Sequence, residues 1–306
     1  MNTRHYDIYD GASRSREHII VAALVLLVIA AVSSVPILAS RSVTQQAAQV
    51  PVVTAPVEKT EPAKVIEEAA PVVATPQIVD LQPVLDTWAA GHPKQQWGVS
   101  VKSLSGKEFQ AELNSDKQFR SASLYKLFLV QPLFAKYSLA QQQTTIVKVG
   151  ESTRSLASCV DVMLRLSDNP CGEAVAGKLG WTKVSRELKA AGYTKTDLSK
   201  ADAIVTSAGD TTRYLEQLNG AMLDEASKAV VMNSLLKQKW NQGIPAGCPG
   251  CTVANKTGSI PSITHDAAIV QYAGGTYVIT ILSEGGTFKQ IAELTAQIQA
   301  AINAVQ

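Results

Sequence analysis

A serine and a lysine three residues apart begin an apolar run in the segment "RSASLYKLFLV" (residues 120–130). A serine hydroxyl is a weak nucleophile at neutral pH and needs a base within hydrogen-bonding distance. Residues three apart on a helix lie on the same face, so Lys126 can reach Ser123, and the first helical turn offers free N–H groups to an oxyanion. The spacing is typical of a nucleophile with an amine base. A second S-x-x-K, from Ser234 to Lys237, ends a lysine-rich helical run, where we expect only a solvated surface.

Two further motifs follow the S-x-x-K motif along the chain, and their order strengthens its interpretation as a catalytic motif. Ser167-Asp168-Asn169 ends a helical run, and Lys256-Thr257-Gly258 ends a strand-like run. With "SDNPCGEAVAGKLG" and "IPAG…VANKTGS" around them, the three motifs together resemble the class A β-lactamase and penicillin-binding protein superfamily. The resemblance covers roughly residues 80–306. Each motif alone could be a helix cap, a turn or a strand end.

The resemblance implies a role for each residue of the chemical step. Ser123 would attack a carbonyl and become acylated. Lys126, with its pKa lowered by burial among other cations, would act as the neutral base. Ser167 would relay a proton to the leaving nitrogen, and Lys256 would add positive potential to the relay and to the substrate carboxylate. Asp168 would be a structural acceptor that pins its loop.

The resemblance also implies a substrate-binding set around the motifs. Asn169 would hold a substrate amide, and Thr257 would donate its hydroxyl to the substrate carboxylate. Gly258 would let the substrate backbone lie against the strand edge. The backbone N–H groups of Ser123 and Ser259 would form the oxyanion hole. No cofactor and no metal are needed for this chemistry.

One element of the class A pattern is missing, namely the glutamate of an E-x-x-L-N loop that activates the deacylating water. The corresponding region, residues 192–215, contains no glutamate. Asp202 and Asp197 are the nearest carboxylates and are candidates for that role, as is Lys126, and without one of them deacylation would be slow. The family's cation on the strand after K-T-G is also absent. His265 lies near there, and we expect it to be a half-exposed strand residue.

Three functions remain open at this point. The first is a serine hydrolase that opens β-lactams, and the second is a D-alanyl-D-alanine carboxypeptidase acting on peptidoglycan, which needs no E-x-x-L-N glutamate. The third is a domain that binds wall peptides without turnover. The complete set of nucleophile, base and relay disfavours the third, because a binding domain has no use for a paired base and proton relay.

The N-terminus predicts an exported, membrane-bound protein. Residues 18–40 carry no charge, and about 20 such residues span a bilayer core. Three arginines precede this stretch and one follows closely, so we expect residues 1–17 in the cytoplasm and the rest outside. A signal peptide cleaved near "AVSS" is the alternative. Residues 41–78, rich in Pro, Ala and Val, predict a disordered linker to a catalytic domain at 79–306.

The net charge and the cysteines limit the kinds of ligand, partner and cross-link that we expect. The formal charge of +2 gives no reason to expect nucleic acid, and we expect a monomer. The four cysteines lie in the exported part, where oxidation is allowed and three pairings are possible. Their order suggests Cys159 with Cys171 and Cys248 with Cys251, although the second pair would close a very tight loop. A zinc site is disfavoured because neither His92 nor His265 has ligand spacing to a cysteine pair.

The hydrophobic periodicities predict an α+β domain. An antiparallel sheet would be built from both ends of the chain and packed with a helical middle, in a β-lactamase/transpeptidase-like arrangement. Strands are expected at 96–104, 108–114, 251–258, 265–274 and 276–284. A first helical stripe covers 78–88, a terminal helix covers 287–306, and a core helix over 123–140 is expected to kink near Pro132.

Overall fold

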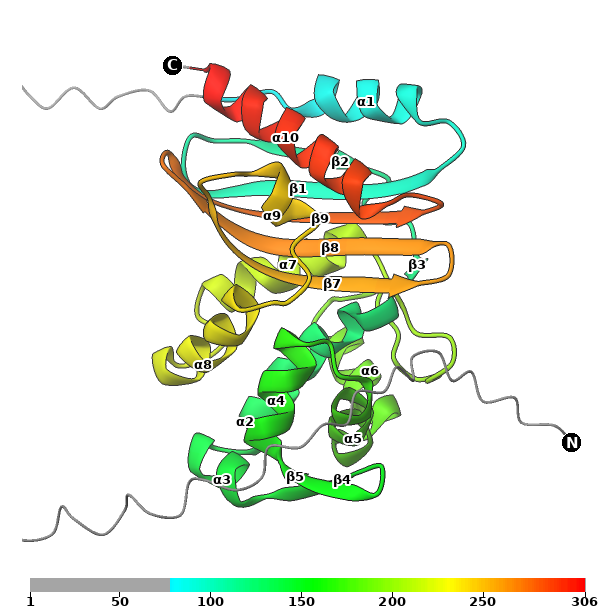
Figure 1. Cartoon of the computed structure of the whole chain (residues 1–306), viewed down its shortest axis with the longest axis vertical. Coiled ribbons are helices and arrows are strands. Elements are labelled where there is room, and N and C mark those ends of the chain that lie inside the picture. Colours follow the sequence, from blue (N-terminus) through cyan, green and yellow to red (C-terminus); the bar gives the residue numbers. More distant parts are fainter. Residues whose placement is uncertain (1–77, 306) are drawn as a thin grey trace, which may run out of the picture. The chain divides into compact units, whose positions relative to one another are not determined.

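The computed structural model describes residues 78–305, which form an α+β domain around one antiparallel sheet (Figure 1). The sheet has five strands in the order β2-β1-β9-β8-β7, and every neighbouring pair is antiparallel. Two strands come from the N-terminal side and three from the C-terminal side, as the sequence predicted. Their bounds are β1 Gln96–Gly106, β2 Gln110–Leu113, β7 Thr252–Ile260, β8 Ile263–Tyr272 and β9 Gly275–Glu284.

Helices cover both faces of this sheet (Figure 1). The first helix, α1 (Gln82–Gly91), and the last, α10 (Phe288–Ala304), pack on one face around a core that includes Leu85, Tyr277 and Leu294. The opposite face meets the helical part of the domain. Side chains alternate between the two faces along each strand, so Ala254, Lys256 and Gly258 of β7 share one face.

The helical middle is more divided than the periodicities suggest. The expected single helix over 123–140 is wrong, because the chain forms a 3-10 helix, η1, and then two short α-helices. Pro132 lies inside the first of these rather than at a break. The helices are η1 Ala122–Leu129, α2 Val130–Lys136, α3 Leu139–Thr144, α4 Leu156–Arg165, α5 Asn169–Leu179, α6 Trp181–Ala190, α7 Ala208–Asn219, α8 Glu225–Leu236 and α9 Ile244–Gly247.

Two small strand pairs were not predicted from the sequence. β3 (Phe119–Arg120) pairs with β6 (Val205–Thr206), and β4 (Ile146–Val149) pairs with β5 (Ser152–Ser155). The first pair fixes the chain just before η1, since Ser121 also donates its N–H to the carbonyl of Ile204 at 2.9 Å. The segment that leads into the nucleophile is therefore held by residues 83 to 87 positions further along the chain.

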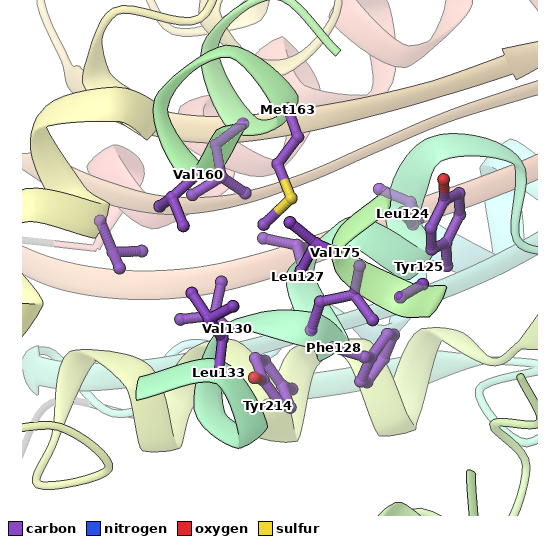
Figure 2. Packing of buried hydrophobic residues seen from close by; sticks show 14 of the residues in the cluster. Leu124, Tyr125, Leu127, Phe128, Val130, Leu133, Val160, Met163, Val175 and Tyr214 are labelled. Atoms are coloured by element: carbon purple, nitrogen blue, oxygen red, sulfur yellow. The ribbon is translucent and has the colours of Figure 1, made fainter. Parts of the chain in front are cut away.

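The side chains of η1 are the centre of the helical core (Figure 2). Leu124, Leu127 and Phe128 are completely buried, and they pack among side chains of α4, α5 and α7, such as Met163 and Val175. Complete burial of such a side chain contributes about 1.5–3 kcal/mol. The serine of the S-x-x-K motif thus stands on an element that the core holds firmly.

The four cysteines form two disulfides, Cys159–Cys171 and Cys248–Cys251, with Cα–Cα distances of 4.9 and 5.5 Å. The first joins α4 to α5 across the S-D-N turn. The expected anchor at 18–40 and almost all of the expected linker lie outside the described residues. Within 78–305, no helix combines the length and the apolar character that crossing a bilayer requires.

Candidate active site

Ser123 and Lys126 lie side by side on η1. The Lys126 side chain is completely buried, and its Nζ donates to the Oγ of half-buried Ser123 at 3.0 Å. Ala122, just before the serine, has a left-handed backbone with φ 46°. A non-glycine residue in that region costs about 1–3 kcal/mol and persists only where its surroundings impose it. The packing of η1 and the bond from Ser121 to Ile204 supply that constraint.

The S-D-N motif is the turn between α4 and α5. Ser167 follows the end of α4 with a left-handed φ of 62°, a conformation common just after a helix end. Asp168 caps α5 by accepting the N–H of Cys171 at 2.8 Å, which is the pinning role expected from the sequence. Lys126 Nζ donates to the Ser167 carbonyl at 2.6 Å and to Asn169 Oδ1 at 2.7 Å.

Lys256 approaches the same turn from strand β7. Its side chain is completely buried, and its Nζ donates to Ser167 Oγ at 2.8 Å and to the Thr257 carbonyl at 2.7 Å. Lys126 Nζ lies 3.5 Å from the same Ser167 hydroxyl. Three segments far apart in the sequence therefore bring Ser123, Lys126, Ser167 and Lys256 into one hydrogen-bonded chain.

Burial sets the proton affinity of both lysines. Burial lowers the pKa of Lys126 to about 8, and the negative charges of Asp168 and Glu173 oppose that shift. Burial lowers the pKa of Lys256 well below its usual value, and the charge of Lys126 lowers it further. Because burial disfavours the charged form of Lys126, a neutral amine is accessible next to Ser123 near neutral pH, which is what a general base requires.

The rest of the K-T-G segment follows Lys256 along β7. Thr257 is buried and Ser259 is exposed. A Cβ at Gly258 would come within 3.0 Å of the Ser121 carbonyl and 3.2 Å of Ala122 Cβ. In this structure the glycine therefore lets β7 pack closely against the segment that carries the nucleophile.

His265 differs from the expected half-exposed strand residue. It is completely buried on β8, where its Nε2 contacts the Arg120 carbonyl at 2.8 Å and its Nδ1 accepts the N–H of Ser283 at 3.1 Å. This geometry requires a neutral ring with the proton on Nε2, and burial lowers the pKa of His265 to about 4. His265 fixes the strand β3 segment and supplies no cation to a substrate.

Neither loop aspartate contacts the nucleophile in the structure. The carboxylate of Asp197 accepts from Lys189 Nζ at 2.7 Å and from Ser185 Oγ at 2.7 Å, both on α6. These bonds, with those from Ser199, hold the pKa of Asp197 far below its usual value. Asp202 is exposed, and the group that it offers to the rest of the domain is its backbone carbonyl, which accepts from Arg120. The structure therefore does not bring either side chain together with Ser123 and Lys126.

Gly172 on α5 is a site residue that sequence reasoning missed. A Cβ there would lie 2.7 Å from Lys126 Cε and 2.8 Å from the hydroxyl of Tyr125. Only a residue without a side chain lets α5 approach the lysine so closely. The available signal was its place in the same helix turn as Asn169, three residues earlier.

A pair of glycines on α5 tests this contact. Gly172→Ala is expected to lower the free energy of unfolding by about 1–3 kcal/mol, the usual cost of overpacking. Gly177→Ala, on the same helix with nothing within 4 Å of its Cβ, is expected to be neutral or stabilising by up to about 1 kcal/mol. Urea unfolding of both variants measures the difference. Equal stabilities would contradict the close approach of α5 to Lys126.

Residues 78–305 hold no group of three or more His, Cys, Asp or Glu side chains arranged to bind a metal ion.

Comparison with known proteins now identifies the family. The family model described as "Beta-lactamase enzyme family" matches residues 80–306. This chain belongs to the β-lactamase enzyme family. It is a serine β-lactamase-like hydrolase, in agreement with the resemblance noted on its three motifs. A comparison with curated proteins found no match.

Solved structures with this fold cover most of the chain. A mutant of PBP-A in an acyl-enzyme complex with penicillin G is 18% identical with a TM-score of 0.65, covering 73% of this chain and 96% of that one. A β-lactamase from Sphaerobacter thermophilus is 19% identical with a TM-score of 0.61, covering 73% and 97%. A class A β-lactamase from Mycobacterium abscessus is 20% identical with a TM-score of 0.64, covering 72% and 99%. At these identities the likeness establishes the β-lactamase/transpeptidase-like α+β fold.

Proposed function

We propose that this β-lactamase family member opens the β-lactam amide through an ester with Ser123. The observation that carries the proposal is the position of Lys126 Nζ, 3.0 Å from Ser123 Oγ, with its pKa lowered to about 8 by burial. A base poised near the working pH best combines the correct protonation state with proton affinity. Penicillin G forms an acyl-enzyme with a PBP-A mutant of the same fold.

The steps of acylation follow from the chain of hydrogen bonds. The neutral amine of Lys126 accepts the proton of Ser123 as Oγ bonds to the carbonyl carbon. The backbone N–H groups of Ser123 and Ser259 hold the oxyanion. As the C–N bond breaks, the Ser167 hydroxyl gives its proton to the leaving nitrogen and recovers one from the Lys126 ammonium, 3.5 Å away, while Lys256 Nζ donates to Ser167 Oγ at 2.8 Å.

The S-D-N and K-T-G segments supply the contacts to the substrate. Asn169 holds the amide side chain of the substrate, while Thr257, Ser259 and Lys256 receive its carboxylate and Gly258 keeps the strand edge close to the nucleophile. Asn169 and Ser259 are exposed, which makes them accessible to such a ligand.

The catalytic domain lies outside the cytoplasm and is tethered to the membrane through residues 18–40. The uncharged sequence of that segment supports this location. So do the two disulfides, which persist in an oxidising compartment.

Labelling of cell fractions with a fluorescent penicillin tests both the chemistry and the location. We expect a covalent band at the mass of the full chain in the membrane fraction. Purified wild-type protein that stays unlabelled would favour a wall-peptide-binding domain, and a shorter labelled band in the soluble fraction would favour a cleaved signal peptide.

A D-alanyl-D-alanine carboxypeptidase is the second candidate, favoured by the lack of contact between either loop aspartate and Ser123. The lifetime of the penicillin adduct, followed by mass spectrometry, separates the two functions. An adduct that disappears within seconds supports the β-lactamase, and one that lasts for hours supports the peptidase.

A further inference from the structure

One face of α5 is turned toward Lys126. Asn169, the first residue of this helix, accepts from Lys126 Nζ at 2.7 Å, and a Cβ at Gly172 would collide with Lys126 Cε. Residues four apart on a helix lie on the same face, about 5–6 Å between Cβ atoms. Glu173 therefore stands one turn beyond Asn169 on the face of α5 that meets the base.

The charge of Glu173 reaches the reacting groups. Burial lowers the pKa of Lys126, whereas the negative charges of Asp168 and Glu173 act to raise it. Burial also raises the pKa of Tyr125, and the same two carboxylates raise it further, Glu173 more than Asp168. The Glu173 carboxylate on α5 therefore lies close enough to influence the pKa values of both Tyr125 and Lys126 on η1.

The Glu173 carboxylate is not engaged by another described residue, unlike the carboxylates of Asp168 and Asp197. Its side chain is exposed and makes no hydrogen bond or ion pair with any residue between 78 and 305. Asp168 is occupied as the cap of α5, and Asp197 is bound to Ser185 and Lys189 on α6. Leu198, which follows Asp197, is completely buried in the helical core, so the loop turns an apolar side chain inward.

We propose that Glu173 holds and deprotonates the water that releases the acyl group from Ser123. This inference rests on the proposed function, because it concerns the second half of that reaction. The helix α5 would supply the carboxylate that the missing E-x-x-L-N loop provides elsewhere in the superfamily.

The step balances with groups already present. The water oxygen bonds to the ester carbonyl carbon while one water proton passes to the Glu173 carboxylate. The tetrahedral intermediate collapses, the bond between carbon and Ser123 Oγ breaks, and Oγ takes the proton that Glu173 passes on through Lys126. This transfer leaves Glu173 ionised and Lys126 neutral, as at the start, with a free carboxylic acid product.

Glu173→Gln separates this step from acylation. The rate of covalent labelling by a fluorescent penicillin should not fall, because loss of the negative charge lowers the Lys126 pKa further and favours the neutral amine. The lifetime of the adduct, followed by mass spectrometry of the intact protein, should lengthen about 10²–10⁴-fold, the usual range for a general base. Glu151→Gln, an exposed glutamate in the β4–β5 turn, is the matched control and should behave as wild type.

The outcomes distinguish this inference from the proposed function. Wild-type protein that never labels contradicts the proposed function itself. A Glu173→Gln adduct with the wild-type lifetime overturns the role of Glu173 alone. A wild-type adduct that lasts for hours overturns that role together with β-lactam turnover and supports the peptidase. A lengthened lifetime in Asp202→Asn or Asp197→Asn, with no change in Glu173→Gln, assigns the water to the loop instead.

Discussion

Replacing Ser123 by alanine is expected to abolish covalent labelling by penicillin and to lower any β-lactam turnover by a factor on the order of 10⁶, the loss seen when a serine protease loses its nucleophile. Ser123 Oγ is the hydroxyl paired with the amine of Lys126 at 3.0 Å. The other hydroxyl of the site, Ser167 Oγ, accepts from Lys256 Nζ at 2.8 Å. Peptide mapping of the labelled protein measures the site of attachment directly.

The second S-x-x-K of the chain provides the matched control. Contrary to the expected solvated surface, Ser234 is buried on α8, where its hydroxyl contacts Asp161 at 3.1 Å and the Val230 carbonyl at 3.3 Å. Ser234→Ala therefore costs about 1 kcal/mol of stability through the lost hydrogen bond but keeps full labelling. Label on Ser234, or a Ser123→Ala variant that labels normally with a native circular dichroism spectrum, would contradict the assignment of the nucleophile.

The sequence could predict the members of the site because each motif is local. A spacing of three residues places Ser123 and Lys126 on one helical face, whether the helix is the expected α-helix or the observed 3-10 helix. Hydrophobic periodicity also predicted which segments form the sheet. That Ser167 meets both lysines followed only from the resemblance to a family, since no local pattern joins residues 126, 167 and 256.

What the sequence could not predict depends on contacts between distant segments. The buried His265 ring is satisfied by the Arg120 carbonyl and the Ser283 N–H, which come from two other strands. The close approach at Gly172 exists because η1 and α5 pack face to face, and its three-residue spacing from Asn169 is the local signal that distinguishes it from Gly177 on the same helix. Glu173 lies on the helix face shared with Asn169, whereas the family pattern directs attention to the loop at residues 192–215.

The left-handed backbone conformations at Ala122 and Ser167 also could not be predicted from the sequence. Neither residue type favours φ values of 46° and 62°, so neither position could be recognised from its letter. Ala122 immediately precedes the nucleophile Ser123, and Ser167 is itself a residue of the site. The surrounding packing imposes these conformations.

Replacing Lys126 by methionine is expected to slow acylation by penicillin about 10²–10⁴-fold, because the variant keeps the length of the side chain but loses the general base. Lys126→Arg sharpens the test, since a guanidinium keeps the positive charge and does not deprotonate in proteins. Both variants should therefore be impaired to a similar degree. Full activity of the arginine variant would mean that charge, not proton transfer, is what position 126 supplies.

The pH profile of wild-type acylation gives the same mechanism an independent measure. Only the neutral amine accepts the proton of Ser123, and the pKa of Lys126 is lowered to about 8. The second-order rate constant for labelling should therefore rise with pH through about 8 and level off above it, and this rise should vanish in Lys126→Met. A lysine with its usual pKa would instead keep the rate rising beyond pH 10, and stopped-flow fluorescence between pH 6 and pH 10 distinguishes the two curves.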